Sequence, residues 1–199
     1  MIALIDYGAG NLHSVANALK AAGATDLTIT ADPDAVAKAD RIVLPGVGAF
    51  AACMNGLTAI SGMVEAMRER VLDGGVPFLG VCVGMQLLAT TGEEFGSHAG
   101  LGWIDGTVRR LAASPGVTVP HMGWNDVVPV VAHPLLVPGE AYFLHSYAFD
   151  GEQVLATTDH GGPVAAAIGR DNLLGVQFHP EKSQRYGLAL LERFLEWRP

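Results

Sequence analysis

An α/β fold with an open, mostly parallel twisted sheet and helices on both faces is the fold class that this sequence predicts. In the first half of the chain, short apolar segments such as residues 2–5 and 41–44 alternate with segments whose apolar residues recur at helical spacing. Such alternation is typical of parallel strands joined by right-handed crossovers. The second half is mostly strand-like, which predicts antiparallel additions to the sheet or a small second sheet.

The first half is expected to begin with a strand at residues 2–5. Residues 12–19 follow at helical spacing, and Gly23 is expected to end that helix. Asp32 and Pro33 are typical of the N-cap and the first residue of a short helix. Further strands are expected at 27–30, 41–44 and 77–81, with a helix between the last two whose apolar face is Met63, Val64, Met67 and Val71.

In the second half, turns rich in Gly, Pro and Asp separate the strand-like segments. Those segments are residues 103–111, 125–130, 142–144, 154–157, 164–168 and 173–178. Leu190, Leu191, Phe194 and Leu195 return to helical spacing within a last segment, 186–197. Because the chain has no internal repeat, low-complexity tract or linker, residues 1–199 are expected to form a single domain.

The composition excludes several function classes. Half of the 199 residues are apolar and 16% are charged, which predicts a folded chain with a full core. The net charge of −8 and the lack of a basic run argue against nucleic acid or an anionic membrane as partner. The sequence contains neither a membrane-length apolar stretch nor a basic signal-peptide start. With two cysteines, no disulfide framework is expected, and a cytoplasmic location is the default.

The most informative segment is residues 77–86, PFLGVCVGMQ, in which an apolar strand ends at Cys82 between Gly80 and Gly84. G-x-C-x-G is the pattern of a nucleophile elbow, a tight strand-to-helix turn that leaves no room for a Cβ atom two residues away on either side. The turn places the sulfur at the start of a helix, where unpaired N–H groups favour a thiolate. Taken alone, the pattern fits a buried structural cysteine equally well.

A second segment supplies the partners that a cysteine nucleophile needs. A strand leads to His179, Pro180 ends it, and Glu181 follows. A nucleophile of this kind requires a base and a third group that fixes the tautomer of that base. The spacing places His179 and Glu181 on one face of an extended segment. Cys82, His179 and Glu181 are therefore the predicted catalytic residues, although the His-Pro-Glu segment alone also fits a surface turn.

A glycine loop follows the strand at 41–44 and is expected to lie near the elbow. In an open α/β sheet, loops at the carboxyl ends of the strands converge on one crevice. Backbone N–H groups of this loop and of the residue after Cys82 are suited to bind a developing oxyanion. The predicted oxyanion and substrate-binding residues are Gly46, Val47, Gly48, Val83, Gln86, His145, Ser146 and Tyr147.

Cofactor and metal sites are not expected. The Gly8-Ala9-Gly10 segment after the first strand lacks the third glycine of a dinucleotide-binding loop, and no acidic residue ends the second strand. The histidines other than His179 do not occur at metal-ligand spacing. Cys53 lacks a glycine-flanked turn and is expected to contribute to packing.

Together the motifs resemble those of the class I, triad-type glutamine amidotransferases. The GVCVGMQ elbow and the distant FHPE segment carry this resemblance. Further motifs are similar to the histidine-biosynthesis branch of the family, the glutaminase subunits of imidazole glycerol phosphate synthases. They lie at residues 5–12, 44–50, 120–125, 143–147 and 178–183, so the resemblance extends over the whole chain.

The resemblance implies a reaction. Cys82 attacks the side-chain amide of glutamine, and His179 protonates the departing ammonia to leave a γ-glutamyl thioester. His179 then activates the water that releases glutamate, while Glu181 orients the histidine. The resemblance also implies that Gly48 and Gln86 help to hold glutamine.

The resemblance further implies a partner, a (β/α)8 cyclase subunit in a heterodimer. That subunit uses the ammonia to make imidazole glycerol phosphate and an aminoimidazole carboxamide ribonucleotide. The Val47 peptide is the implied oxyanion donor, with an orientation that depends on the partner. Residues 8–11, Trp124, Asn125 and Lys182 are the expected interface residues.

Three alternatives remain open from the sequence. The first is a glutaminase that serves another synthase, such as those for pyridoxal phosphate, anthranilate or GMP, against which the PHMGWN and His-Ser-Tyr motifs argue. The second is a non-catalytic relative that acts as a binding module, against which the intact nucleophile and His-Pro-Glu pair argue. The third and weakest is a cysteine peptidase with the same elbow.

Overall fold

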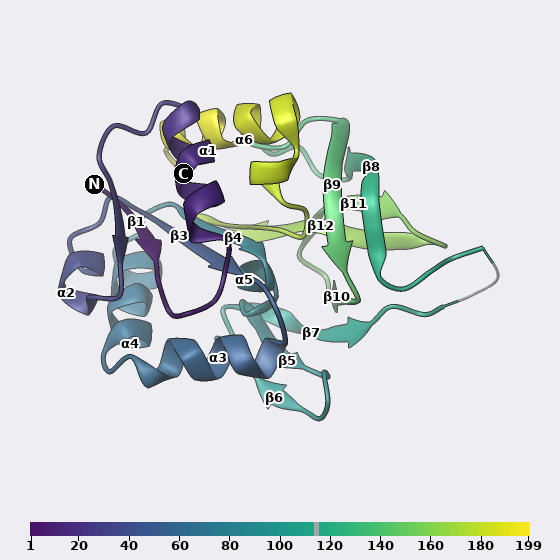
Figure 1. Ribbon diagram of the computed structural model, residues 1–199, viewed down its shortest axis with the longest axis horizontal. Coiled ribbons are helices and arrows are strands. Elements are labelled where there is room, and N and C mark those ends of the chain that lie inside the picture. The colour runs from purple at the N-terminus through teal and green to yellow at the C-terminus, as the bar shows by residue number, and fades with distance from the viewer. Residues whose placement is uncertain (114–115) are drawn as a thin grey trace.

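The computed structural model describes residues 1–113 and 116–199 and contains a nine-stranded twisted sheet (Figure 1). Its strands, in spatial order, are β2 (Leu27–Thr30), β1 (Ile2–Ile5), β3 (Arg41–Gly46), β4 (Phe78–Cys82), β13 (Leu173–Val176), β12 (Pro163–Arg170), β11 (Val154–Asp159), β8 (His121–Pro129) and β9 (Gly139–His145). The first five are parallel and the remaining pairs are antiparallel. All residues of β1, β3, β4 and β13 are buried, which explains why these strands are predominantly apolar.

Helices cover both faces of the sheet. In Figure 1, α1 (Leu12–Ala21) and α6 (Gln184–Glu196) lie together above it, and α3 (Phe50–Ala59) and α4 (Met63–Arg68) lie below it. The predicted fold class is therefore confirmed. Within the described ranges, no helix combines the length and the apolar character that crossing a membrane requires.

The remaining helical segments are short. The helix α2 (Pro33–Val36) starts as predicted, because the Asp32 carboxylate accepts a hydrogen bond of 3.0 Å from the Asp34 N–H. The apolar face expected from Met63 to Val71 is helical but continues beyond α4 as a π turn at Glu69–Asp73. The helix α5 (Val83–Gln86) follows β4 directly, and a 3₁₀ turn, η2 (Pro180–Lys182), follows β13.

The second half of the chain contains both arrangements that the sequence left open. Four strands, β8, β9, β11 and β12, extend the main sheet in antiparallel pairs. In a separate four-stranded sheet, β10 (Tyr147–Asp150) and β7 (Ile104–Arg110) join two strands from the end of the first half, β5 (Ala89–Gly92) and β6 (His98–Ala99). The sequence predicted β7 but neither β5, β6 and β10 nor α3. The segments ATTG of β5 and HA of β6 lack the large apolar residues that marked the similarly short β1 and β2.

The segment at 173–178 differs from expectation. Its pattern placed it among the antiparallel strands, and β13 does pair antiparallel with β12. It also lies in the middle of the main sheet, parallel to β4, with Leu173 opposite Phe78, which was not expected. A local apolar pattern does not specify the neighbour of a strand, so this placement follows from the whole fold. Because β3, β4 and β13 are parallel neighbours, their carboxyl ends meet at one edge of the sheet.

We predict that Gly84→Ala destabilises the fold by about 3 kcal/mol, because the added methyl group collides with backbone that cannot move away. A Cβ atom at Gly84 would lie 1.9 Å from the carbonyl oxygen of Leu44. Urea denaturation followed by circular dichroism measures the loss. The control is Gly8→Ala, where φ is +84° but no atom lies within 4 Å, and about 1–2 kcal/mol is expected. Equal losses in the two variants would contradict the collision.

Candidate active site

The elbow at Cys82 has the geometry that the sequence predicted. Cys82 is the N-cap of α5 and adopts φ +55° and ψ −112°, a backbone conformation that is rare outside glycine. A Cβ atom at Gly80 would lie 2.6 Å from the carbonyl oxygen of Gly84. The close packing of the turn therefore accounts for both glycines. The Cys82 side chain lies at the carboxyl end of β4. A strained backbone conformation of this kind is typical of functional residues.

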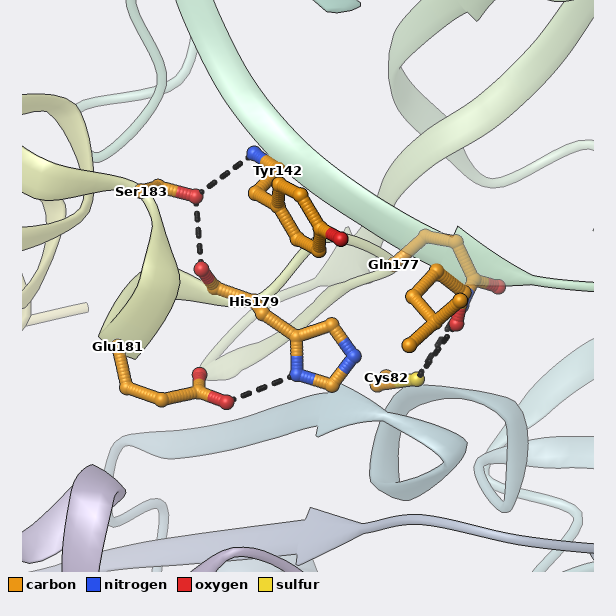
Figure 2. Close-up of polar contacts among 7 residues, drawn as sticks. Cys82, Tyr142, Gln177, His179, Glu181 and Ser183 are labelled. Atoms are coloured by element: carbon orange, nitrogen blue, oxygen red, sulfur yellow. Dashed lines mark hydrogen bonds and ion pairs between the residues drawn. The ribbon is translucent and has the colours of Figure 1, made fainter. Parts of the chain in front are cut away.

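Figure 2 shows the His179 ring between Glu181 and Cys82. The Nδ1 atom of His179 is 2.8 Å from Oε1 of Glu181, and both side chains are almost completely buried. Because a carboxylate accepts this hydrogen bond, Nδ1 carries the proton and Nε2 is the atom left for the sulfur. The three predicted catalytic residues are therefore brought together, although they come from distant segments of the chain.

The electrostatic surroundings of His179 favour its charged form. Burial alone would lower the pKa of this ring, but the interactions with Cys82 and Glu181 outweigh it and raise the pKa to about 9. At neutral pH, His179 therefore holds a proton that it can transfer. A protonated histidine beside a cysteine is the arrangement that donates a proton to a leaving amine.

Ser183 fixes the backbone of His179, a contact that the sequence did not suggest. Its hydroxyl donates a hydrogen bond of 2.7 Å to the His179 carbonyl and accepts one of 2.9 Å from the N–H of Tyr142. The N–H of His179 in turn donates to the Tyr142 carbonyl at 2.9 Å. These bonds, of which Figure 2 draws the two made by Ser183, tie the catalytic turn to β9.

Two glutamines form the opposite side of the site. Nε2 of Gln86 donates to Oε1 of Gln177 at 3.0 Å and to the Tyr147 carbonyl at 2.9 Å. Nε2 of Gln177 then lies 3.8 Å from the Cys82 sulfur and donates to it. Gln86 was predicted for this site but Gln177 was not. The signal for Gln177 was its place two residues before His179 in the extended segment that continues β13, which puts both side chains on one face.

A cavity of about 310 Å³ opens over the sulfur. Of the predicted site residues, Gly46 and Glu181 do not line it, and Glu181 instead lies behind His179. Gly46 is the last residue of β3 and is paired with Cys82, so its backbone lies within the sheet. The cavity is lined by Val47, Gly48, Cys82, Val83, Gln86, Glu94, Pro120, Leu144, His145, Ser146, Tyr147, His179 and Lys182.

Glu94 is an acidic residue of the cavity wall that the sequence analysis missed. It follows β5, and one of its carboxylate oxygens accepts a 2.7 Å hydrogen bond from the N–H of Phe50 at the start of α3. No motif surrounds Glu94, and its position depends on the unpredicted β5. It places a carboxylate in the cavity wall.

His145 belongs to a buried histidine pair. Its Nδ1 lies 2.9 Å from the Tyr147 carbonyl and must donate, so Nε2 accepts at 3.1 Å from Nδ1 of His121. Burial lowers the pKa of His145 to about 3, and burial together with His160 lowers that of His121 to about 4. Both rings are therefore neutral at pH 7. Within the described ranges, no three His, Cys, Asp or Glu side chains are grouped as a metal ion requires.

Comparison with known sequences identifies the family. Residues 3–197 match the family "Glutamine amidotransferase class-I". The chain belongs to this family. The match extends over nearly the whole sequence, so it confirms the resemblance that the elbow and the FHPE segment indicated.

Two curated relatives of this amidotransferase carry the same name, "Imidazole glycerol phosphate synthase subunit HisH". The protein of Zymomonas mobilis subsp. mobilis is 63% identical over all of this chain and 96% of its own. The protein of Caulobacter vibrioides is 54% identical over all of this chain and 99% of its own.

Solved structures share the fold at lower identity. One, described as a glutamine amidotransferase, has a TM-score of 0.77 at 21% identity and covers 98% of both chains. The glutaminase domain of the Trypanosoma brucei CTPS, solved with bound acivicin, has a TM-score of 0.66 at 18% identity, over 100% of this chain and 94% of its own. These matches support the fold of the amidotransferase domain.

We predict that His179 remains protonated until the pH approaches about 9, as measured by NMR of its ring carbon and nitrogens. Because the pKa of His179 is raised above the ordinary value near 6.5, the protonated ring stabilises the folded state. Its contribution to the free energy of unfolding is full below about pH 6.5 and is lost as the pH rises through about 9. Cys82→Ala should move the pKa down, and urea unfolding against pH should show the matching loss. A wild-type ring that titrates below 6.5 would contradict this account.

Proposed function

We propose that this chain is the glutaminase subunit of imidazole glycerol phosphate synthase, which hydrolyses glutamine and delivers ammonia to a cyclase subunit. The observation that carries the proposal is a full-length identity of 63% to a relative of that name. It is supported by a buried Cys-His-Glu arrangement that fits amide hydrolysis.

The chemistry follows from the geometry of the three residues. The Cys82 sulfur, as a thiolate beside the protonated His179 ring, attacks the side-chain amide carbon of glutamine. Backbone N–H groups of Val83 and of the loop at 46–48 bind the oxyanion that forms. His179 then protonates the departing ammonia, which leaves a γ-glutamyl thioester on Cys82. The neutral His179 then deprotonates a water molecule, which attacks the thioester. Glutamate leaves as the Cys82 thiolate and the protonated histidine are restored.

Glutamine recognition is assigned to the cavity wall. The Glu94 carboxylate provides a negative charge that suits the α-ammonium group of a free amino acid. Ser146 and Tyr147 line the same cavity. Because both N–H groups of the Gln86 amide are already bound to Tyr147 and Gln177, we infer that Gln86 mainly holds the wall in place.

The partner is proposed to bind at the rim of the cavity. Met122, Trp124 and Leu144 form an exposed apolar patch on the antiparallel pair β8–β9, with Met122 opposite Leu144. Leu144 also lines the cavity, and so does the expected interface residue Lys182. Exposed apolar side chains that border an active site are typical of a protein interface. Asn125 instead turns inward, because its amide donates to His121 and to the Asp159 carbonyl.

We also infer that residues 1–199 form one glutamine amidotransferase domain that functions in the cytoplasm. The family match over residues 3–197 supports the first inference. The two cysteines, Cys53 and Cys82, are both free thiols, which is consistent with a reducing compartment.

Glutamine hydrolysis by the purified chain, with and without the cyclase subunit of the same organism, tests the proposal. We expect glutamate release that increases when the cyclase and its nucleotide substrate are added. Cys82→Ala should abolish hydrolysis, because no nucleophile remains. The mixture of that variant with cyclase should still make imidazole glycerol phosphate from added ammonium.

Two outcomes of this experiment would contradict the proposal. The first is a wild-type chain that hydrolyses no glutamine in either condition. The second is hydrolysis that responds to a synthase of pyridoxal phosphate, anthranilate or GMP synthesis but not to the cyclase. Hydrolysis of peptides without hydrolysis of glutamine would favour the peptidase alternative.

We predict that Glu94→Gln raises the KM for glutamine by about ten- to hundredfold with little change in kcat. The loss of one charge-assisted hydrogen bond costs about 1.5–3 kcal/mol, and the new amide oxygen can still accept the Phe50 N–H. Steady-state glutamate release measures both constants. The matched control is Glu93→Gln, whose carboxylate binds Arg109 at the surface and should leave KM unchanged. Equal KM values in the two variants would refute the role of Glu94.

A further inference from the structure

Two buried side chains donate hydrogen bonds to backbone carbonyls of the glycine loop at residues 45–48. The hydroxyl of Tyr7, the second residue after β1, donates a hydrogen bond of 2.6 Å to the Pro45 carbonyl. The thiol of Cys53, in α3, lies 3.4 Å from the Val47 carbonyl and donates to it. Tyr7 is 6% exposed and Cys53 is 1% exposed. The Pro45 and Val47 carbonyls, which flank the Gly46–Val47 peptide, therefore both accept hydrogen bonds from buried side chains.

Both donors keep their protons. Burial is the largest cause that raises the pKa of Tyr7, and the neighbouring Cys53 raises it further. Burial likewise raises the pKa of Cys53 above its ordinary value. Burial therefore favours the protonated, hydrogen-bond-donating form of both the hydroxyl and the thiol.

The packing around the loop leaves little freedom for these contacts. A Cβ atom at Gly46 would lie 2.9 Å from the Tyr7 hydroxyl and 2.6 Å from the N atom of Gly84 in α5. A Cβ atom at Gly56 would lie 2.7 Å from the Tyr7 carbonyl, so α3 presses directly on Tyr7. The loop is therefore enclosed between the Tyr7 hydroxyl and the helix that follows Cys82.

The bound carbonyls determine where the loop N–H groups point. In a trans peptide the C=O and N–H bonds point in opposite directions. Because the Val47 carbonyl is directed at Cys53, the N–H of Gly48 is directed away from α3. Val47 and Gly48 line the cavity over Cys82. Within the described ranges, neither Val47 nor Gly48 donates a backbone hydrogen bond, so these N–H groups are available to a ligand.

We propose that Tyr7 and Cys53 are positioning residues that hold the loop at 46–48 in the orientation that presents its N–H groups to the oxyanion. This inference rests on the proposed glutaminase function. It assigns Cys53 a role in the reaction beyond the packing that the sequence predicted. The two side chains touch the loop and not the substrate, so they influence the rate through the orientation of the peptide bonds.

Three variants test the proposal in the complex with the cyclase subunit. Tyr7→Phe and Cys53→Ala each remove one donor, and Cys53→Ser keeps one at the second position. Loss of a complete oxyanion donor lowers kcat by about 10²–10³-fold, so a misoriented donor is expected to lower it about tenfold. We expect this loss in kcat for Tyr7→Phe and Cys53→Ala with KM within about twofold of wild type. Cys53→Ser should recover most of the rate.

Two further measurements separate positioning from general damage. The melting temperature identifies a variant that has lost its fold. If Tyr7→Phe does not fold, the comparison of Cys53→Ala with Cys53→Ser still tests the proposal. Alkylation of Cys82 by iodoacetamide, followed by peptide mass spectrometry, does not pass through a tetrahedral oxyanion. Its rate should therefore match wild type in folded variants.

The outcomes distinguish this proposal from the proposed function. A wild-type complex without glutaminase activity would overturn both. An active wild type with unchanged kcat in folded Tyr7→Phe and Cys53→Ala would overturn the positioning role alone. Equal losses in Cys53→Ala and Cys53→Ser, or a parallel fall in the alkylation rate, would also overturn it, because either result indicates packing around Cys82.

Discussion

The left-handed turn at Cys82 is the constraint on which the arrangement of the site depends. The turn connects β4 directly to α5 and holds a non-glycine residue at φ +55°. Such a conformation costs free energy and persists only where the surroundings fix it. Here Gly80 and Gly84 let the helix pack on the backbone of the turn and of β3. The same close approach places the start of α5 beside the glycine loop, so nucleophile and oxyanion donors are positioned together.

The rest of the site is brought to this turn by the order of the strands. Insertion of β13 beside β4 delivers Gln177 and His179 to the sulfur from the C-terminal end of the chain. Ser183 then ties the His179 turn to β9, and Gln86 ties Gln177 to the start of β10. The polar groups around Cys82 are thus held by hydrogen bonds between separate elements. This is the form of support that keeps a catalytic arrangement preorganised.

The sequence predicted what local patterns encode and missed what only the sheet order creates. Cys82, His179 and Glu181 were recognisable because a turn and a two-residue spacing demand particular residue types. The parallel pairing of β13 with β4 was not recognisable, because the sequence of an apolar strand does not specify which strand it pairs with. Glu94 follows a strand without an apolar run, and its place in the cavity wall depends on the distant contact with Phe50. Cys53 lies only six residues after Val47, but its contact with the loop depends on α3, which no sequence pattern indicated.

The central claim is that the Cys82 sulfur forms a covalent bond with the side-chain acyl group of glutamine. Rapid acid quench of the complex during turnover, followed by peptide mass spectrometry, tests it most directly. The account predicts a γ-glutamyl group on the peptide that contains Cys82, which disappears when glutamine is exhausted. Steady glutamate release with no such adduct, or with the adduct on Cys53, would contradict the account.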